Sequence, residues 1–114
     1  MEKSMELKVI IAIVRSDALQ AVESRLQQAG VQGITVTQSK GYGEYRNLFT
    51  SDWMSGGVRL EIYTAADKVD AIVKAIIDAG HTGEPGDGLV AVLPVDKAYS
   101  VRFRSEAIPN RPRS

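Results

Sequence analysis

The residues best suited to chemistry in this chain form a short glycine-rich stretch, TGEPGDG, at residues 82–88. Its glycines, Gly83, Gly86 and Gly88, can adopt positive φ angles and let successive backbone N–H groups converge on one anion. The stretch follows a helical pattern and runs directly into an apolar, strand-like segment. It is therefore either a phosphate-binding nest or, as most glycine-rich connections are, a tight turn between a helix and a strand.

Two further segments carry groups that would complete an anion site. The sequence KGYG, residues 40–43, places glycines around an aromatic ring at the end of a predicted strand. The sequence VRFRSE, residues 101–106, places Arg102 and Arg104 just after another predicted strand. Two guanidinium groups spaced by two along a strand share one face and can grip a polyphosphate together. All three segments are thus predicted to lie at strand ends.

Other reactive groups are few. His81 is the only histidine and the chain has no cysteine, so neither residue type can found a transition-metal site. We predict instead that His81 caps the end of a helix. Glu44, Asp52 and Glu61 carry carboxylates, but no nucleophile is paired with an orienting group. The sequence predicts neither a metal site nor an enzyme.

Composition restricts the class of protein. The 114 residues are 44% hydrophobic, which suits one domain with a small core. Lys+Arg and Asp+Glu balance at 14 each, so no overall field attracts the chain to nucleic acid or to an anionic membrane. The apolar run at residues 9–14 is too short for a signal peptide or a membrane span. We expect a cytoplasmic protein with no nucleic-acid partner and no direct membrane insertion.

The first half of the hydrophobic pattern predicts a strand and a helix. Residues 7–14 form a continuous, β-branched-rich apolar run, which is typical of a central strand covered on both faces. From Ser16 onward the spacing becomes helical. Ser16 or Asp17 is the predicted N-cap, and Gly30 is the predicted left-handed C-cap.

The second half predicts a hairpin, a helix and a last strand. Residues 33–43 and 58–64 alternate apolar and polar side chains, as two paired strands do. The helical period returns over residues 67–79, where Gly80 ends it, and residues 89–95 form the fourth strand. The resulting order is strand, helix, strand, strand, helix, strand.

This order predicts an α+β, ferredoxin-like βαββαβ sandwich, with two helices on one face of an antiparallel sheet. A single domain would occupy residues 1–114, with a flexible N-terminus at residues 1–6 and a flexible C-terminal tail at residues 105–114. Because this fold supports many activities, function has to be argued from the site.

Three segments together resemble the PII signal-transduction family over residues 7 to about 106: GVQGITVTQSKGYG, VRLEIYTAADKVDAIVKAI and HTGEPGDGLVAVLPVDKA. PII proteins are ferredoxin-like homotrimers that bind adenine nucleotides in the clefts between subunits. They insert a long, mobile T-loop into transporters or enzymes. The resemblance therefore implies a homotrimer that binds an adenine nucleotide and controls a transporter or an enzyme.

The resemblance also implies a nucleotide site, residue by residue. Residues 86–88 match the family's phosphate-binding B-loop, and residues 41–43 match the start of the T-loop beside the nucleotide. Other positions match a residue near the adenine, an acidic residue, and two arginines that clamp phosphates from the neighbouring subunit. The implied residues are Thr35, Gly41, Tyr42, Gly43, Glu61, Gly86, Asp87, Gly88, Arg102 and Arg104. The arginine match requires one inserted residue; without it, Ser100 and Arg102 occupy the two positions.

The predicted T-loop, residues 44–57, has the sequence EYRNLFTSDWMSGG and is shorter than in typical PII proteins. Its partner surface must therefore differ from theirs. Phe49, Trp53 and Met54 are candidate partner-binding residues, because interaction loops commonly carry a few aromatic or large apolar anchors. The alternative is that Trp53 packs back onto its own trimer.

Charged positions of the family are also changed. Tyr45, Gly57 and Leu89 stand where the family has a glutamine for Mg²⁺ and 2-oxoglutarate, a supporting lysine and the B-loop lysine. These replacements favour ADP or AMP as the effector over Mg·ATP. Some PII-like relatives encoded near carboxysome or bicarbonate-transport genes respond to bicarbonate together with adenine nucleotides. Arg46 and Arg59 are candidate ligands for such an anion.

Two other classes of protein remain open at this point. One is a metal-tolerance protein of the CutA type, or another ferredoxin-like trimer without nucleotide sensing. The other is a small metabolite-binding subunit of an enzyme.

Overall fold

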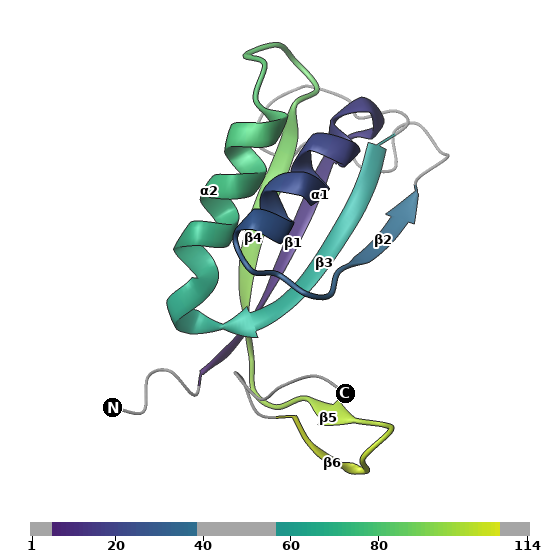
Figure 1. Cartoon of the computed structure of the whole chain (residues 1–114), viewed down its shortest axis with the longest axis vertical. Coiled ribbons are helices and arrows are strands. Elements are labelled where there is room, and N and C mark those ends of the chain that lie inside the picture. The colour runs from purple at the N-terminus through teal and green to yellow at the C-terminus, as the bar shows by residue number, and fades with distance from the viewer. Residues whose placement is uncertain (1–5, 39–56, 108–114) are drawn as a thin grey trace.

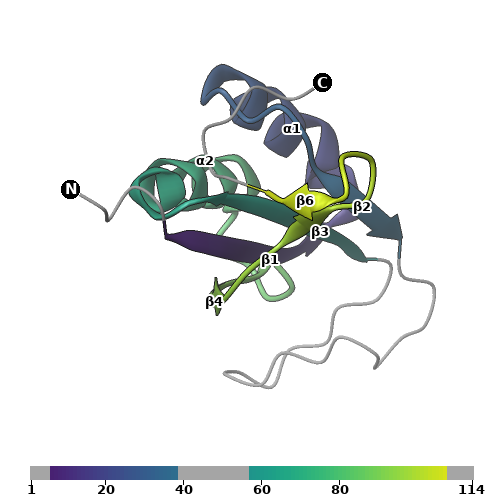
Figure 2. The same ribbon diagram turned by 90° about the horizontal axis from the view of Figure 1, so that it is seen from below.

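A computed structural model describes residues 6–38 and 57–107 of the chain. Four antiparallel strands form one sheet, and two helices cover one of its faces (Figures 1 and 2). The strand order across the sheet is β2-β3-β1-β4. The elements are β1 (Leu7–Arg15), α1 (Leu19–Gln28), β2 (Thr35–Gln38), β3 (Gly57–Ala65), α2 (Val69–Gly80) and β4 (Gly88–Val95). The predicted ferredoxin-like order is confirmed.

Strand β1 lies inside the sheet, where β3 and β4 pair with it along most of its length. Its residues Ile10, Ala12 and Val14 are buried on the side that faces the helices. Leu60 and Ile62 of β3 join the same layer through their register with Ala12 and Ile10. Burying each of these large side chains contributes about 1.5–3 kcal/mol. The continuous apolar run therefore does mark the central strand.

The helices complete this core with the predicted apolar stripes. Val22 and Leu26 of α1 and Ile72 and Ile76 of α2 are all buried against the sheet. Each pair is spaced by four residues, so both members lie on one helix face. Neither helix in the described part of the chain has the length and apolar character needed to cross a membrane.

The predicted N-cap of the first helix is wrong. The chain first makes a short 3-10 turn, Ser16–Ala18, and no side chain caps either that turn or α1. The reason is that the Asp17 carboxylate pairs with the Arg15 guanidinium and is not used as a cap. At the other end of α1, Gly30 has a φ of 89°, so the predicted left-handed glycine is confirmed.

The second helix ends one residue later than its pattern predicts. Gly80 is its last helical residue, and His81, with extended backbone, is the C-cap. The His81 N–H donates to the Ile77 carbonyl oxygen at 2.9 Å. The prediction that His81 sits at a helix end is confirmed.

Strands β2 and β3 form the predicted antiparallel hairpin. Thr35 lies opposite Glu61, and Gln38, the last residue of β2, lies opposite Val58. All four residues of β2 are exposed, as expected for a short edge strand. The connection between the two strands, residues 39–56, lies outside the described residues.

The chain after β4 differs from its prediction. It folds into a small hairpin of β5 (Tyr99–Ser100) and β6 (Ser105–Glu106), at the end of the sheet away from the glycine-rich stretch (Figure 1). Arg102 and Arg104 lie in the turn between these strands, and Arg104 has a φ of 58°. They are not on one strand, so the argument that they share a strand face is wrong. The predicted tail, residues 105–114, begins at the first residue of β6.

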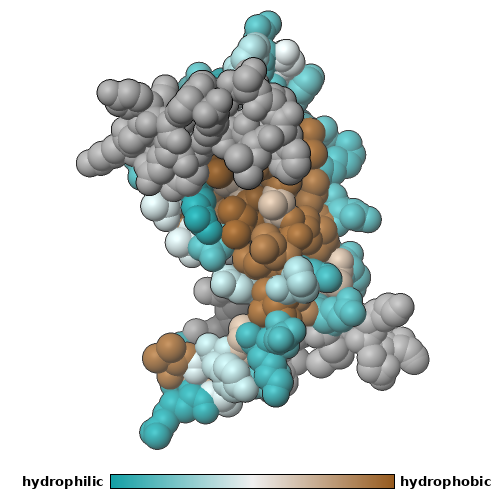
Figure 3. Space-filling model, turned by 180° about the vertical axis from the view of Figure 1, so that it is seen from behind, coloured by the Kyte–Doolittle hydropathy of each residue, from teal (hydrophilic) through white to brown (hydrophobic). Residues whose placement is uncertain are grey.

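The sheet face that the helices leave uncovered, here called the open face, has two halves. The half over β1 and β4 is apolar and appears as the brown patch in Figure 3. The half over β2 and β3 is largely polar. From the strand registers, the apolar residues are Val9, Ile11, Ile13, Leu89, Ala91 and Leu93, and the polar ones are Thr35, Thr37, Arg59 and Glu61.

Candidate functional site

One rung of the sheet places the last described residue of β2 at the same end of the sheet as the glycine loop. Gln38, Val58, Val14 and Gly88 lie opposite one another in succession across the four strands. The glycine loop, residues 82–88, therefore enters the sheet at the end where β2 leaves it and β3 begins. This is the end at which the sequence predicts an anion site.

The glycine loop has the predicted backbone conformation. Gly83, Gly86 and Gly88 have φ angles of 88°, 92° and 119°. Side chains are strongly disfavoured at such angles, so the glycines are needed for the shape of the loop.

Gly88 also has a packing role that the sequence does not reveal. A Cβ atom on Gly88 would lie 1.9 Å from the carbonyl oxygen of Ile13 in β1. The start of β4 therefore approaches the backbone of β1 too closely for any side chain. The absence of a side chain at this position is required by the sheet itself, whether or not a ligand binds.

The side chain of Asp87 holds the loop closed. One carboxylate oxygen, Oδ2, accepts hydrogen bonds from the backbone N–H groups of Thr82 at 2.7 Å and Gly83 at 2.8 Å. The other, Oδ1, accepts the Thr82 hydroxyl at 2.5 Å. Chiefly because of that hydroxyl bond, and then the two backbone bonds, the pKa of Asp87 falls from 3.8 to about 2. Asp87 is therefore ionised at neutral pH and turned into its own loop.

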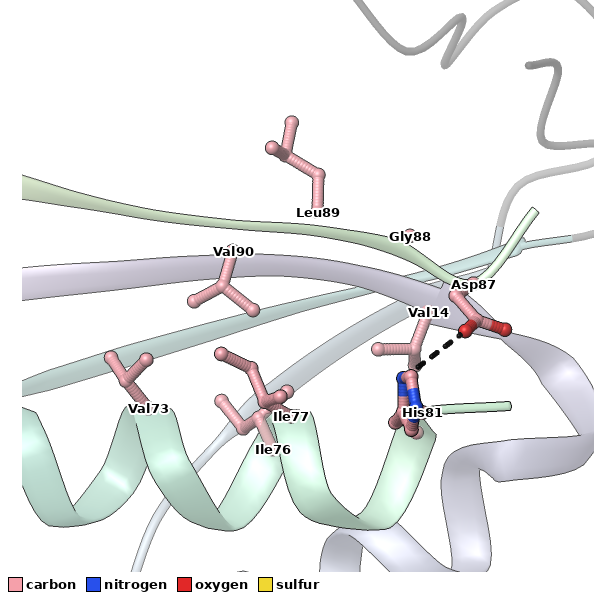
Figure 4. A pocket seen from close by; sticks show the side chains of 10 residues that line it. Val14, Val73, Ile76, Ile77, His81, Asp87, Gly88, Leu89 and Val90 are labelled. Carbon is pink, nitrogen blue, oxygen red and sulfur yellow. Dashed lines mark ion pairs between the residues drawn. The ribbon is translucent and has the colours of Figure 1, made fainter. Parts of the chain in front are cut away.

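Arg15 connects this loop to the body of the protein, and sequence reasoning missed it. Its Nε lies 3.6 Å from Asp87 Oδ1, its Nη2 donates to the Gly80 carbonyl oxygen at 3.4 Å, and its Nη1 pairs with Asp17. The imidazole Nδ1 of His81 lies 3.8 Å from Asp87 Oδ2 (Figure 4). The sequence signal for Arg15 is its place as a charged residue directly after the apolar run at residues 7–14.

An apolar cleft of about 280 Å³ lies beside the loop, between α2 and β4 (Figure 4). Val73, Ile76 and Ile77 line it from α2, and Val90 points into it from β4. Leu89 extends from the opposite side of β4, towards the open face (Figure 4). The two sides of β4 at this end thus offer different surfaces, both of them apolar.

Three predicted residues lie together on the polar half of the open face. Thr35 and Glu61 are opposite each other on β2 and β3, and Arg59 is two residues from Glu61 along β3. Arg59 and Glu61 are half-buried, and neither forms an ion pair within the described part of the chain.

The predicted arginines are not near the glycine loop in the same chain. The eight residues of β4 separate them, a length of about 25 Å for extended backbone. Arg102 instead places its Cζ atom 4.9 Å from the centroid of the Phe103 ring. The two candidate half-sites, the glycine loop and the hairpin that carries the arginines, therefore lie at opposite ends of β4 in one chain (Figure 1).

The remaining predicted residues lie outside the described residues. They are Gly41, Tyr42, Gly43, Arg46, Phe49, Trp53 and Met54. Within residues 6–38 and 57–107, no three histidine, aspartate or glutamate side chains gather into a potential metal site.

Comparisons with known proteins agree on one family. The model of the family "Nitrogen regulatory protein P-II" matches residues 7–105. A nitrogen regulatory protein P-II from Cereibacter sphaeroides is 38% identical over 104 residues, which cover 84% of this chain and 92% of that protein. A protein of the same name from Rhizobium etli is 34% identical over 103 residues, covering 84% and 92% of the two chains.

A solved structure supports the same assignment. The crystal structure of Arabidopsis thaliana PII bound to citrate superposes with a TM-score of 0.74 at 33% sequence identity, and 90% of each chain is covered. The family match spans both the glycine loop and the two strands of the open polar half. By its sequence, its fold and its glycine loop, this chain belongs to the P-II family of nitrogen regulatory proteins.

Proposed function

We propose that this PII protein is a homotrimeric regulator that binds an adenine nucleotide between subunits and signals its occupancy to a transporter or enzyme. The observation that carries the proposal is the position of the two half-sites at opposite ends of β4. The glycine loop offers backbone N–H groups and the hairpin offers Arg102 and Arg104, but one chain cannot bring them together. A second copy of the chain would supply the missing half.

The open face supports association of copies. Its apolar half is a contiguous patch (Figure 3), and such patches on small proteins usually mark interaction surfaces. The two halves differ in polarity, so a head-to-tail contact between copies is favoured over a symmetric pair. Head-to-tail contacts that close generate rings, of which a trimer is the smallest beyond a dimer.

The glycine loop would bind the phosphates of the nucleotide, and the polar half of the open face would bind its base and ribose. The positive-φ glycines suit the phosphates, because they let N–H groups converge on negative charge. Thr35 and Glu61, side by side on the open face, offer a hydroxyl and a carboxylate to the base and the ribose.

Leu89 supports a preference for the shorter nucleotides. It follows Gly88 directly and is half-buried beside Ile13, so no cation stands at this position to meet a third phosphate. ADP or AMP is therefore expected to bind at least as tightly as Mg·ATP, by calorimetry with each nucleotide. Much tighter binding of Mg·ATP would contradict the preference.

Bicarbonate is the proposed second effector. Arg59 supports it, since this half-buried cation has no ion-pair partner in the described part of the chain. The Arabidopsis PII bound to citrate shows that a related protein accepts a small carboxylate anion. Fluorescence of Trp53, the only tryptophan, should respond to ADP and bicarbonate together differently from either alone. Identical spectra in all states would remove the sensing role of residues 44–57.

A mixing experiment tests the shared site. Gly86→Val removes the loop half and Arg102→Ala removes the arginine half, so each variant alone should lose ADP binding. In a trimer that contains both variants, one of the three interfaces pairs an intact loop with an intact arginine. Random mixing by co-expression should therefore restore about a quarter of the sites. If mixed oligomers of proven composition bind no ADP, the two halves of the site belong to one chain or the site lies elsewhere.

A further inference from the structure

Asp87 creates an electrostatic problem for an anion site in the glycine loop. Its carboxylate is ionised, already accepts the N–H groups of Thr82 and Gly83, and would repel a phosphate group bound elsewhere on the loop. Glu84 adds a second carboxylate in the same loop. An anion site here therefore requires a compensating cation that stays in place.

Arg15 is that cation on geometric grounds. Its side chain is fixed from two directions besides Asp87, by Asp17 and by the Gly80 carbonyl oxygen at the C-terminal end of α2. The side chain is 31% exposed, compared with 77% for Asp17, so water screens it less. His81, the other group near Asp87, is 69% exposed and carries charge only when protonated.

Strand pairing places Arg15 beside both the glycine loop and the start of β3. Arg15 is the last residue of β1 and lies opposite Gly57, where β3 begins, while the preceding residue Val14 lies opposite Gly88. The Nε of Arg15 is buried, has no hydrogen-bond partner among the described residues, and faces Asp87 at 3.6 Å. The guanidinium is thus held against the loop by the framework of the sheet.

We propose that Arg15 is the positioning residue of the anion site: it offsets part of the negative charge of the Asp87 carboxylate and holds the glycine loop in the shape that accepts a nucleotide phosphate. This proposal rests on the proposed nucleotide binding and adds to it a residue that touches no ligand. Asp87 closes the loop, and Arg15 makes that closure compatible with binding an anion.

The test compares ADP affinities in a double-mutant cycle. Arg15→Gln should weaken ADP binding about 5- to 30-fold, which lies within the range of typical pairwise couplings, because Asp87 is then left uncompensated. Arg15→Lys should recover part of the lost affinity, since lysine keeps the positive charge but lacks the several N–H donors of the planar guanidinium. Asp87→Asn in the Arg15→Gln background should restore affinity, because an amide can keep the loop hydrogen bonds without the charge. A merely structural role for Arg15 predicts no such restoration.

Arg25→Gln is the matched control. Arg25 also pairs with an aspartate, Asp78 at 3.9 Å, but it connects α1 to α2 and forms no ion pair with Asp87. The control should leave ADP affinity unchanged.

Carboxyl NMR gives a readout that needs no ligand. Arg15→Gln should raise the pKa of Asp87, and the amide signals of residues 82–88 should shift. Unchanged ADP affinity in Arg15→Gln, with wild-type binding established, would overturn the proposal. If the wild-type protein binds no adenine nucleotide, the proposed function fails, and an unchanged Asp87 titration in Arg15→Gln then overturns the role of Arg15 separately. Should Arg15→Gln not fold, Arg15→Lys is measured in the same two ways.

Discussion

The two ends of β4 are built on different principles. At its start, the glycine loop is held by the Arg15 side chain of β1 and by its own Asp87, and its shape depends on glycines with positive φ angles. At its far end, the β5–β6 hairpin is held by local bonds such as Arg104 N–H to the Ser100 carbonyl oxygen at 2.8 Å, and all its side chains except that of Ser100 are exposed. We therefore expect the backbone shape of the loop to matter most at the start of β4, and the identity of the exposed side chains to matter most at its far end.

The largest expected effect is on stability at the first end. Gly88→Ala forces a Cβ atom against the Ile13 carbonyl oxygen at a φ of 119°, so it should destabilise the protein by at least about 3 kcal/mol. Chemical denaturation measures this. Gly30→Ala is the control: its φ is 89°, but nothing lies within 4 Å of an added Cβ atom, so about 1–2 kcal/mol is expected. Equal losses of stability in the two variants would mean that β4 moves away from β1 and so relieves the contact with the Ile13 carbonyl oxygen.

The next effect is on binding at the second end. Arg102→Ala removes a charge-assisted contact and should cost about 1.5–3 kcal/mol of ADP affinity, with the denaturation midpoint nearly unchanged. Calorimetry and denaturation on the same preparation separate the two quantities. A variant that loses stability as much as affinity would show that the hairpin, too, depends on shape.

A smaller effect depends on pH and reports on Asp87. Its folded pKa, about 2, lies below the ordinary 3.8, so its contribution is present above about pH 4 and is lost as the pH falls towards 2. The difference in Tm between wild type and Asp87→Asn should shrink over that interval. Thr82→Val removes the largest cause of the shift and should move the loss to higher pH. A Tm difference that is constant from pH 5 to 2 would contradict the closing role of Asp87.

The smallest expected effect is on stability at the far end of β4, in the β5–β6 hairpin. Arg104 occupies a positive φ of 58°, where glycine is at ease, so Arg104→Gly should change the free energy of unfolding by less than about 1 kcal/mol. If the side chain carries the function, ADP affinity should fall nonetheless. Wild-type affinity in this variant would remove Arg104 from the nucleotide site.

The sheet and its helices could be predicted because each has a regular period. The apolar run of β1, the alternation of β3 and the four-residue spacing of Val22 and Leu26 each report directly on which faces are buried. Gly30 and the glycines of the loop could be assigned for a similar reason, since positive φ is a property of single residues.

Features that leave no regular period in the sequence could not be predicted. The ion pair between Arg15 and Asp87 joins positions far apart in the sequence, and the use of Asp17 by Arg15 removes it as a helix cap. Strands of two residues, such as β5 and β6, are too short to show alternation, so Arg102 and Arg104 were assigned to the wrong local structure.

The pairing of β1 has a further consequence for how the chain is made. β1 is synthesised well before β4, so the ladder between them cannot form until residues 88–95 have left the ribosome. Until then an apolar strand stays without one of its neighbours and is exposed to wrong pairing. Chains that stop before β4 should therefore aggregate during synthesis, and the interval before β4 is released is the one in which chaperones would be needed most.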